Sequence, residues 1–85
     1  MNTTGTITAL IVARDGGTAV AVTLCANRPA AIAELRNIVD EVAQHFGPEA
    51  LPDGGTARMH TDQLIKWMRD TDGAHVHIEE CPINE

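Results

Sequence analysis

Two apolar segments near the start of the chain, separated by a tight turn, constrain the fold more than any other feature. Both segments, residues 6–13 and 18–25, are rich in β-branched side chains, and the turn between them reads RDGG. Asp and Gly accept the positive φ angles of tight hairpin turns at the least cost. The sequence therefore predicts an antiparallel β-hairpin that turns at Asp15 and Gly16.

The length of this turn decides which side chains of the hairpin share a face. A two-residue turn places six apolar side chains together: Ile7, Ala9, Ile11, Val20, Val22 and Leu24. A three-residue turn places Leu10 and Val12 beside the valines instead, because a shift of one residue exchanges the two faces. Both registers stay open. In either one the first strand is apolar on both faces, which predicts that it is the central strand of the sheet.

The middle of the chain carries the clearest helix signal. Within NRPAAIAELRNIVDEVAQHFGP, apolar residues recur at intervals of three and four and form one stripe, made of Ile32, Leu35, Val39, Val42 and Phe46. Asn27 can cap the start of this helix, and Gly47 followed by Pro48 can end it, with Gly47 in the left-handed conformation. We expect Leu35 and Val42 to be fully buried.

A loop, a second helix and a final strand complete the chain. Thr61 is expected to open the second helix, whose inward side chains are Leu64, Ile65 and Met68. The last segment, HVHIEECPI, predicts a strand with Val76 and Ile78 facing inward.

The order of the elements predicts the fold class. The order β-β-α-α-β indicates an α+β fold, a two-layer sandwich in which two helices cover one face of a three-stranded sheet. Eighty-five residues with 23 large apolar side chains are enough for one hydrophobic core. We therefore expect residues 1–85 to form a single small globular domain.

The charge distribution and the first residues of the chain exclude several classes of partner. Residues 37–85 carry ten carboxylates against three Lys and Arg side chains, and the chain has one Phe, one Trp and no Tyr. Nucleic-acid binding needs clustered cations or aromatic stacking platforms, so neither DNA nor RNA is expected. The first residues lack a basic leader, and their apolar run stops at Arg14. We expect a cytoplasmic protein without membrane contact.

The final strand raises the question of a metal site. His75, His77, Glu79 and Cys81 occupy alternate positions, which lie on one face of a strand. Two imidazoles two residues apart can bind zinc, nickel or copper. A closed site needs four ligands, however, and Cys81 is expected beyond the end of the strand. We therefore predict no metal and no cofactor, and keep metal binding at His75 and His77 as the alternative.

The two cysteines are expected to be free. The second and third strands are predicted to run in opposite directions, which would place Cys25 and Cys81 at opposite ends of the sheet, beyond the reach of a disulfide. Cys25 precedes the first helix and is a third, weaker candidate as a thiol nucleophile. Its surroundings match no thiol-enzyme motif, and we predict no catalytic residue.

The uncovered face of the sheet is the predicted functional surface. We expect it to bind a protein partner or a second copy in a homodimer, through Leu10, Val12, His75, His77 and Glu79. The alternative is that the loop between the helices covers this face.

The predicted function is that of a small acidic, non-catalytic protein-binding module. Arginine outnumbers lysine five to one and alanine is abundant, as is typical of GC-rich genomes. This bias favours an accessory or host-interaction protein of a phage or another mobile element.

Overall fold

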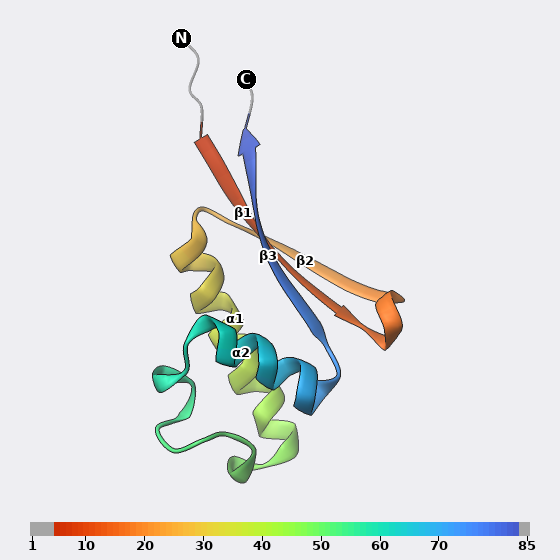
Figure 1. The fold of residues 1–85 in the computed structure, drawn as a ribbon, viewed down its shortest axis with the longest axis vertical. Helices are drawn as coiled ribbons and strands as arrows, with labels where there is room; N and C mark the ends of the chain where they lie inside the picture. The colour runs from red at the N-terminus through yellow and green to blue at the C-terminus, as the bar shows by residue number, and fades with distance from the viewer. Residues whose placement is uncertain (1–4, 84–85) are drawn as a thin grey trace.

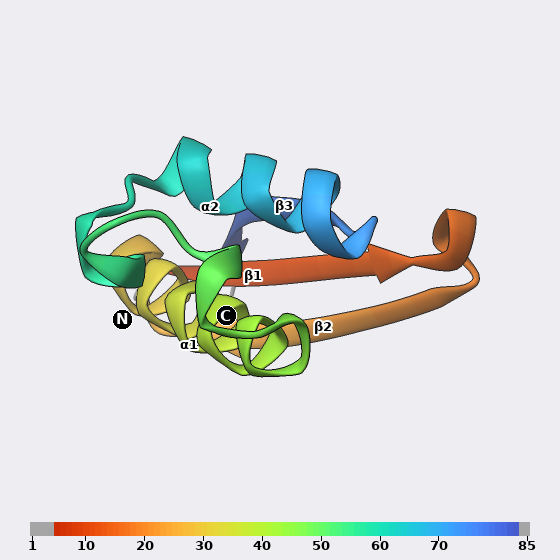
Figure 2. The same ribbon diagram turned by 90° about the horizontal axis from the view of Figure 1, so that it is seen from below.

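Three strands and two helices make up the computed structural model, which describes residues 5–83. In chain order they are β1 (Gly5–Arg14), β2 (Ala19–Cys25), α1 (Arg28–Phe46), α2 (Thr61–Trp67) and β3 (His75–Ile83). Short 3-10 turns occupy the loop between the helices, and α2 continues into one π-helical turn, Met68–Asp72. Both helices lie on the same side of the sheet (Figures 1 and 2). The predicted α+β fold with the order β-β-α-α-β is confirmed.

The sheet is antiparallel, with the strand order β2-β1-β3, so the prediction that the first strand is central is confirmed. Arg14 pairs with Ala19, which leaves four residues in the hairpin loop. Three of them, Asp15, Gly16 and Gly17, have positive φ angles. The predicted turn residues are right and both predicted turn lengths are wrong. A four-residue loop nevertheless gives the same alternation of faces as a two-residue turn.

The third strand runs in an unexpected direction. Both β2 and β3 are antiparallel to β1, so they run parallel to each other, and the predicted opposite directions are wrong. Cys81 lies within β3 and pairs with Ile7, while Cys25 pairs with Thr8. The two cysteines therefore lie at the same end of the sheet. They are free as predicted, but for another reason: β1 separates them by two strand spacings, about 10 Å, and they face opposite sides.

The hydrophobic core lies between the helices and one face of the sheet. Leu10 and Val12 of β1 are buried there, against Leu64, Trp67 and Met68 from α2 and the turn that follows it. Helix α1 adds one row of buried residues at intervals of four: Ala31, Leu35, Val39 and Ala43. The half-buried side chains of Val76 and Ile78 pack against this core from β3, as predicted.

Helix α1 is turned slightly from its predicted orientation. Leu35 has no exposed surface, as expected, but Val42 is only half-buried and Phe46 is 55% exposed. The row centred on Leu35 and Val39 faces the sheet, and the small side chains of Ala31 and Ala43 occupy the buried positions at its ends. The prediction weighted large side chains and so placed the stripe too far toward Val42.

The helix ends follow the capping predictions in part. The side-chain oxygen of Asn27 accepts a hydrogen bond from the backbone N–H of Ala30 at 2.9 Å. Gly47 ends α1 with φ 98° and ψ 165°, a positive φ outside the predicted left-handed helical region. Helix α2 begins at Thr61, as predicted, and His60 is its N-cap residue. Gly73 ends the π-helical turn in the left-handed conformation.

The loop between the helices packs against the helices. The guanidinium group of Arg36 donates hydrogen bonds to the carbonyl oxygens of Thr56 and Met59, at 2.9 and 3.1 Å. The indole N–H of Trp67 donates to the carbonyl oxygen of Ala50 at 2.8 Å. In Figure 1 the loop lies beyond the helices, away from the sheet. The alternative in which this loop covers the open face is therefore wrong.

Candidate protein-binding surface

We call the side of the sheet turned away from the helices the outer face. Directly opposite residues of an antiparallel pair share a face, so the register assigns its members. They are Ile7, Ala9, Ile11 and Ala13 of β1, Val20, Val22 and Leu24 of β2, and His75, His77, Glu79 and Cys81 of β3.

The apolar part of the outer face lies on β2 and its neighbour β1. Val20, Val22 and Leu24 are 56%, 57% and 64% exposed, and Val22 pairs with the half-buried Ile11. We call these four residues the valine–leucine patch. Since alternate residues of a strand lie in a row, three large aliphatic side chains stand side by side in water. This contiguous apolar surface is the candidate site for contact with a partner.

Two of the predicted contact residues lie elsewhere. Leu10 and Val12 are 1% and 3% exposed and belong to the core beneath the helices. The prediction that they face outward is wrong, because the helices cover the face of β1 that carries Leu10 and Val12 and leave the face shared with the β2 valines open. Their position on the outer face is taken by Ile11 and by Ala9, which is small and buried between its neighbouring strands.

The predicted residues of β3 do lie on the outer face. His75, His77 and Glu79 are exposed and pair with Ala13, Ile11 and Ala9 of the central strand. They form a polar strip beside the apolar part of the face. Across residues 5–83, no three His, Cys, Asp or Glu side chains lie close enough to hold a metal ion together. Contact of this strip with a partner stays a prediction.

In the structure, the side chain of Cys25 contributes to packing. Its side chain is half-buried and packs against the core, and its Sγ atom lies 3.9 Å from the carbonyl oxygen of Thr23. Among the described residues, no histidine is hydrogen-bonded to it. Activation of a thiol nucleophile uses an adjacent base, and the hydrogen bond of Cys25 goes to a backbone carbonyl oxygen instead.

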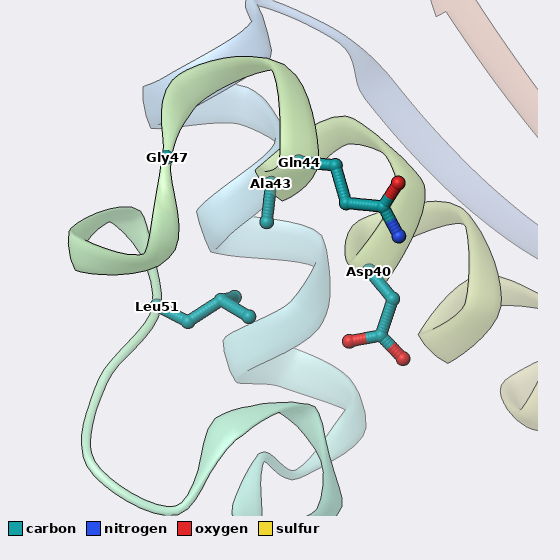
Figure 3. A pocket seen from close by; sticks show the side chains of 5 residues that line it. All are labelled: Asp40, Ala43, Gln44, Gly47 and Leu51. Atoms are coloured by element: carbon teal, nitrogen blue, oxygen red, sulfur yellow. The ribbon is translucent and has the colours of Figure 1, made fainter.

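An open hollow of about 550 Å³ lies beside the C-terminal half of α1. Figure 3 shows the side chains that line it: Asp40, Ala43, Gln44 and Leu51, with Gly47. Asp40 is the one ionisable residue among them, and its carboxylate accepts a hydrogen bond from the Thr56 hydroxyl at 2.9 Å. The lining thus combines one carboxylate and one amide with apolar side chains.

Strand β2 is an open edge of the sheet, which the sequence reasoning did not consider. Every residue of Ala19–Leu24 is exposed, so neither face of this strand is covered over that length. The sequence did contain a signal for this exposure, because no charged residue stands between Asp15 and Arg28. Edge strands usually carry charges or proline that prevent pairing with other chains.

Comparisons with protein-family models, with curated proteins and with solved structures find no match for this chain. In the part of the chain that the structure describes, no helix has the length and apolar character needed to cross a membrane.

Proposed function

We propose that this chain is a non-catalytic protein-binding module that contacts its partner through the valine–leucine patch. The exposure of Val20, Val22 and Leu24 carries the proposal. Full burial of such a side chain is worth about 1.5–3 kcal/mol relative to full exposure. Because more than half of each side chain is in water, a partner that covers all three gains a substantial part of this free energy.

The rest of the outer face suits the rim of a protein interface. Interfaces combine an apolar centre with a polar, solvent-accessible border. Here the polar strip lies on β3, across β1 from β2, and consists of His75, His77 and Glu79. The chain has a net charge of −6, so a partner with a basic border around an apolar centre fits it best.

A binding role is favoured over an enzymatic one by the surroundings of the candidate chemical groups. The hollow beside α1 offers a single carboxylate, already hydrogen-bonded to Thr56. Cys25 packs against the core rather than against a base. The exposed apolar side chains of β2 are the feature that these chemical groups leave unexplained, and burial of apolar surface is a main driving force of protein association.

Photo-crosslinking tests this proposal. A photoreactive phenylalanine analogue is introduced at Val22, and separately at Thr23, which is exposed on the opposite face of the same strand. In lysate of the native host, the probe at position 22 should give a defined protein adduct. An excess of the unlabelled wild-type chain should suppress this adduct, whereas an excess of the Val22→Lys chain should not. The probe at position 23 is the matched control.

Equal adducts with other proteins at both positions, or none at position 22 that the unlabelled chain suppresses, would contradict the proposal; adducts between two copies of this chain count toward neither result. An adduct suppressed equally by the Val22→Lys chain would show that the partner contacts another surface.

A further inference from the structure

We infer that β2 is also a dimerisation edge: a second copy of this chain pairs with it strand to strand, giving a continuous six-stranded antiparallel sheet. This goes beyond the proposed function, which concerns the outer face and leaves its partner unidentified. The inference concerns the hydrogen-bonding edge of β2.

The edge is free to pair. Strand β2 is bonded to β1 on one side only, so along its other side alternate residues direct backbone N–H and C=O groups away from the sheet. The strand contains no proline and is rich in β-branched residues. Its residues from Ala19 to Leu24 are exposed on both faces, so no helix blocks the approach of another strand.

The chain also projects its hairpin away from the helices. Figures 1 and 2 show the turn end of β1 and β2 extending beyond both α1 and α2. The Cα radius of gyration is 14.3 Å, against about 12 Å for a compact domain of this length. A second copy paired with β2 would lie beside this projecting part of the hairpin, which neither helix covers.

The absence of charge identifies a second copy as the occupant. In a two-fold symmetric contact, the same strand meets itself, so that residue i of one copy faces residue j of the other and j faces i, and like charges placed opposite each other are destabilising. No charged residue lies between Asp15 and Arg28, so β2 can meet itself without that repulsion. A pairing centred on Val22 places Val22 opposite Val22, Val20 opposite Leu24, and Ala21 opposite Thr23 of the second copy.

The other edge of the sheet has the opposite character. Strand β3 carries Glu79 and Glu80 at its centre, two histidines before them and Pro82 after them. Two copies paired through β3 would bring like charges together, and proline removes a backbone donor. Self-association through sheet edges is thus blocked at β3 and allowed at β2.

The two-fold axis of such a pair stands perpendicular to the sheet, so the outer faces of both copies lie on the same side. The valine–leucine patches then meet at the centre of the six-stranded sheet and form one surface. Dimerisation would in this way enlarge the surface on which the proposed function depends.

Sedimentation velocity of the purified full-length chain tests the inference. We expect the wild-type chain to sediment at twice its mass of 9.1 kDa. The double variant Ala21→Lys/Thr23→Lys adds charge on the helix side of β2, where both residues are exposed, and leaves the valine–leucine patch unchanged. It should raise the dimer dissociation constant by about 100-fold while the circular dichroism spectrum stays that of the wild type.

The matched control carries two lysines at exposed positions of α1, Ala33→Lys/Gln44→Lys, and should remain dimeric. Single-cysteine chains built on Cys25→Ser/Cys81→Ser separate an edge pair from two sheets packed face to face. Oxidation should crosslink the Val22→Cys chain to itself and leave the Ala13→Cys chain uncrosslinked, because Ala13 lies on the central strand.

A dissociation constant of about 100 micromolar lies at the weak end of specific association. A wild-type chain that is still monomeric at that concentration would overturn the inference. So would a dimer that persists in Ala21→Lys/Thr23→Lys, or preferential crosslinking at Ala13. If any of these occurs while the photo-adduct at position 22 remains, the proposed function stands and the partner is another protein.

Discussion

Ile11 pairs directly with Val22 across the hairpin, and their side chains lie side by side on the outer face of the sheet. Leu10, one residue earlier, points the other way and is buried under the helices. The four-residue loop at Asp15–Thr18 sets this arrangement. It places Ile11 on the same face as the β2 valines, and the packing of the helices buries the opposite face, on which Leu10 lies.

A charge at Leu10 should unfold the protein, whereas the same charge at Ile11 should not. Leu10→Lys buries an ammonium group without a partner, at a cost of several kcal/mol out of a total stability of about 5–15 kcal/mol. Ile11→Lys places the ammonium on the half-buried outer face, where its long side chain reaches water. Thermal melting followed by circular dichroism distinguishes the two. A Leu10→Lys chain with a wild-type melting curve would show that the helices cover the other face of β1.

Truncation of Leu35 should cost far more stability than truncation of Val42. Leu35 is fully buried in the row of α1 that faces the sheet, so Leu35→Ala should lower the free energy of unfolding by about 2–5 kcal/mol. Val42 is half-buried, and we expect Val42→Ala to cost about 1 kcal/mol or less. Urea denaturation measures both. Equal losses would mean that α1 is rotated toward Val42, as its apolar stripe alone suggests.

Arg36 should hold the loop between the helices in place. Arg36→Met removes the two hydrogen bonds to the carbonyl oxygens of Thr56 and Met59 and keeps most of the aliphatic length of the side chain. Hydrogen bonds from a charged donor are worth about 1.5–3 kcal/mol each. The backbone amides of Gly55 and Met59, both bonded within the loop, should exchange with deuterium faster in this variant.

The matched control is Arg58→Met, which removes an exposed arginine of the same loop. Unchanged exchange in Arg36→Met, or equal acceleration in both variants, would show that other contacts fix the loop.

Cys25 and Cys81 should stay reduced in the monomer even under mild oxidation. They lie on opposite faces and on the two strands that flank β1, so no side-chain movement brings their Sγ atoms together. Mass spectrometry of the unreduced, unfragmented chain checks this. A monomer mass lower by two hydrogens than that of the reduced chain would contradict the strand order.

Local signals predicted the elements of this fold well. The hairpin and the first helix depend on short-range preferences, such as the positive φ angles of Asp15 and Gly16 and the cap at Asn27. The burial of Ala31 and Ala43 was not predicted, because an alanine carries little apolar signal. Its burial depends on how closely a helix approaches the sheet.

Features set by long-range packing could not be predicted. The direction of β3 depends on how the two helices cross the sheet, which no residue of the chain encodes locally. The exposure of the edge strand β2 has the same cause, since it depends on where α1 and α2 pack against the sheet. The outward position of His77 was predicted, because alternation along one strand needs only the neighbouring Val76 and Ile78.

The central claim is that another protein chain covers the valine–leucine patch, and carbene footprinting tests it within a single molecule. Val22 and Leu24 are 57% and 64% exposed, and Phe46, which lies on α1 away from the patch, is 55% exposed and serves as the internal control. Labelling is compared between the dilute purified chain and the chain in concentrated lysate of its native host. We predict that labelling of Val22 and Leu24 falls severalfold in the lysate relative to that of Phe46. Equal labelling of all three residues under both conditions would contradict the claim.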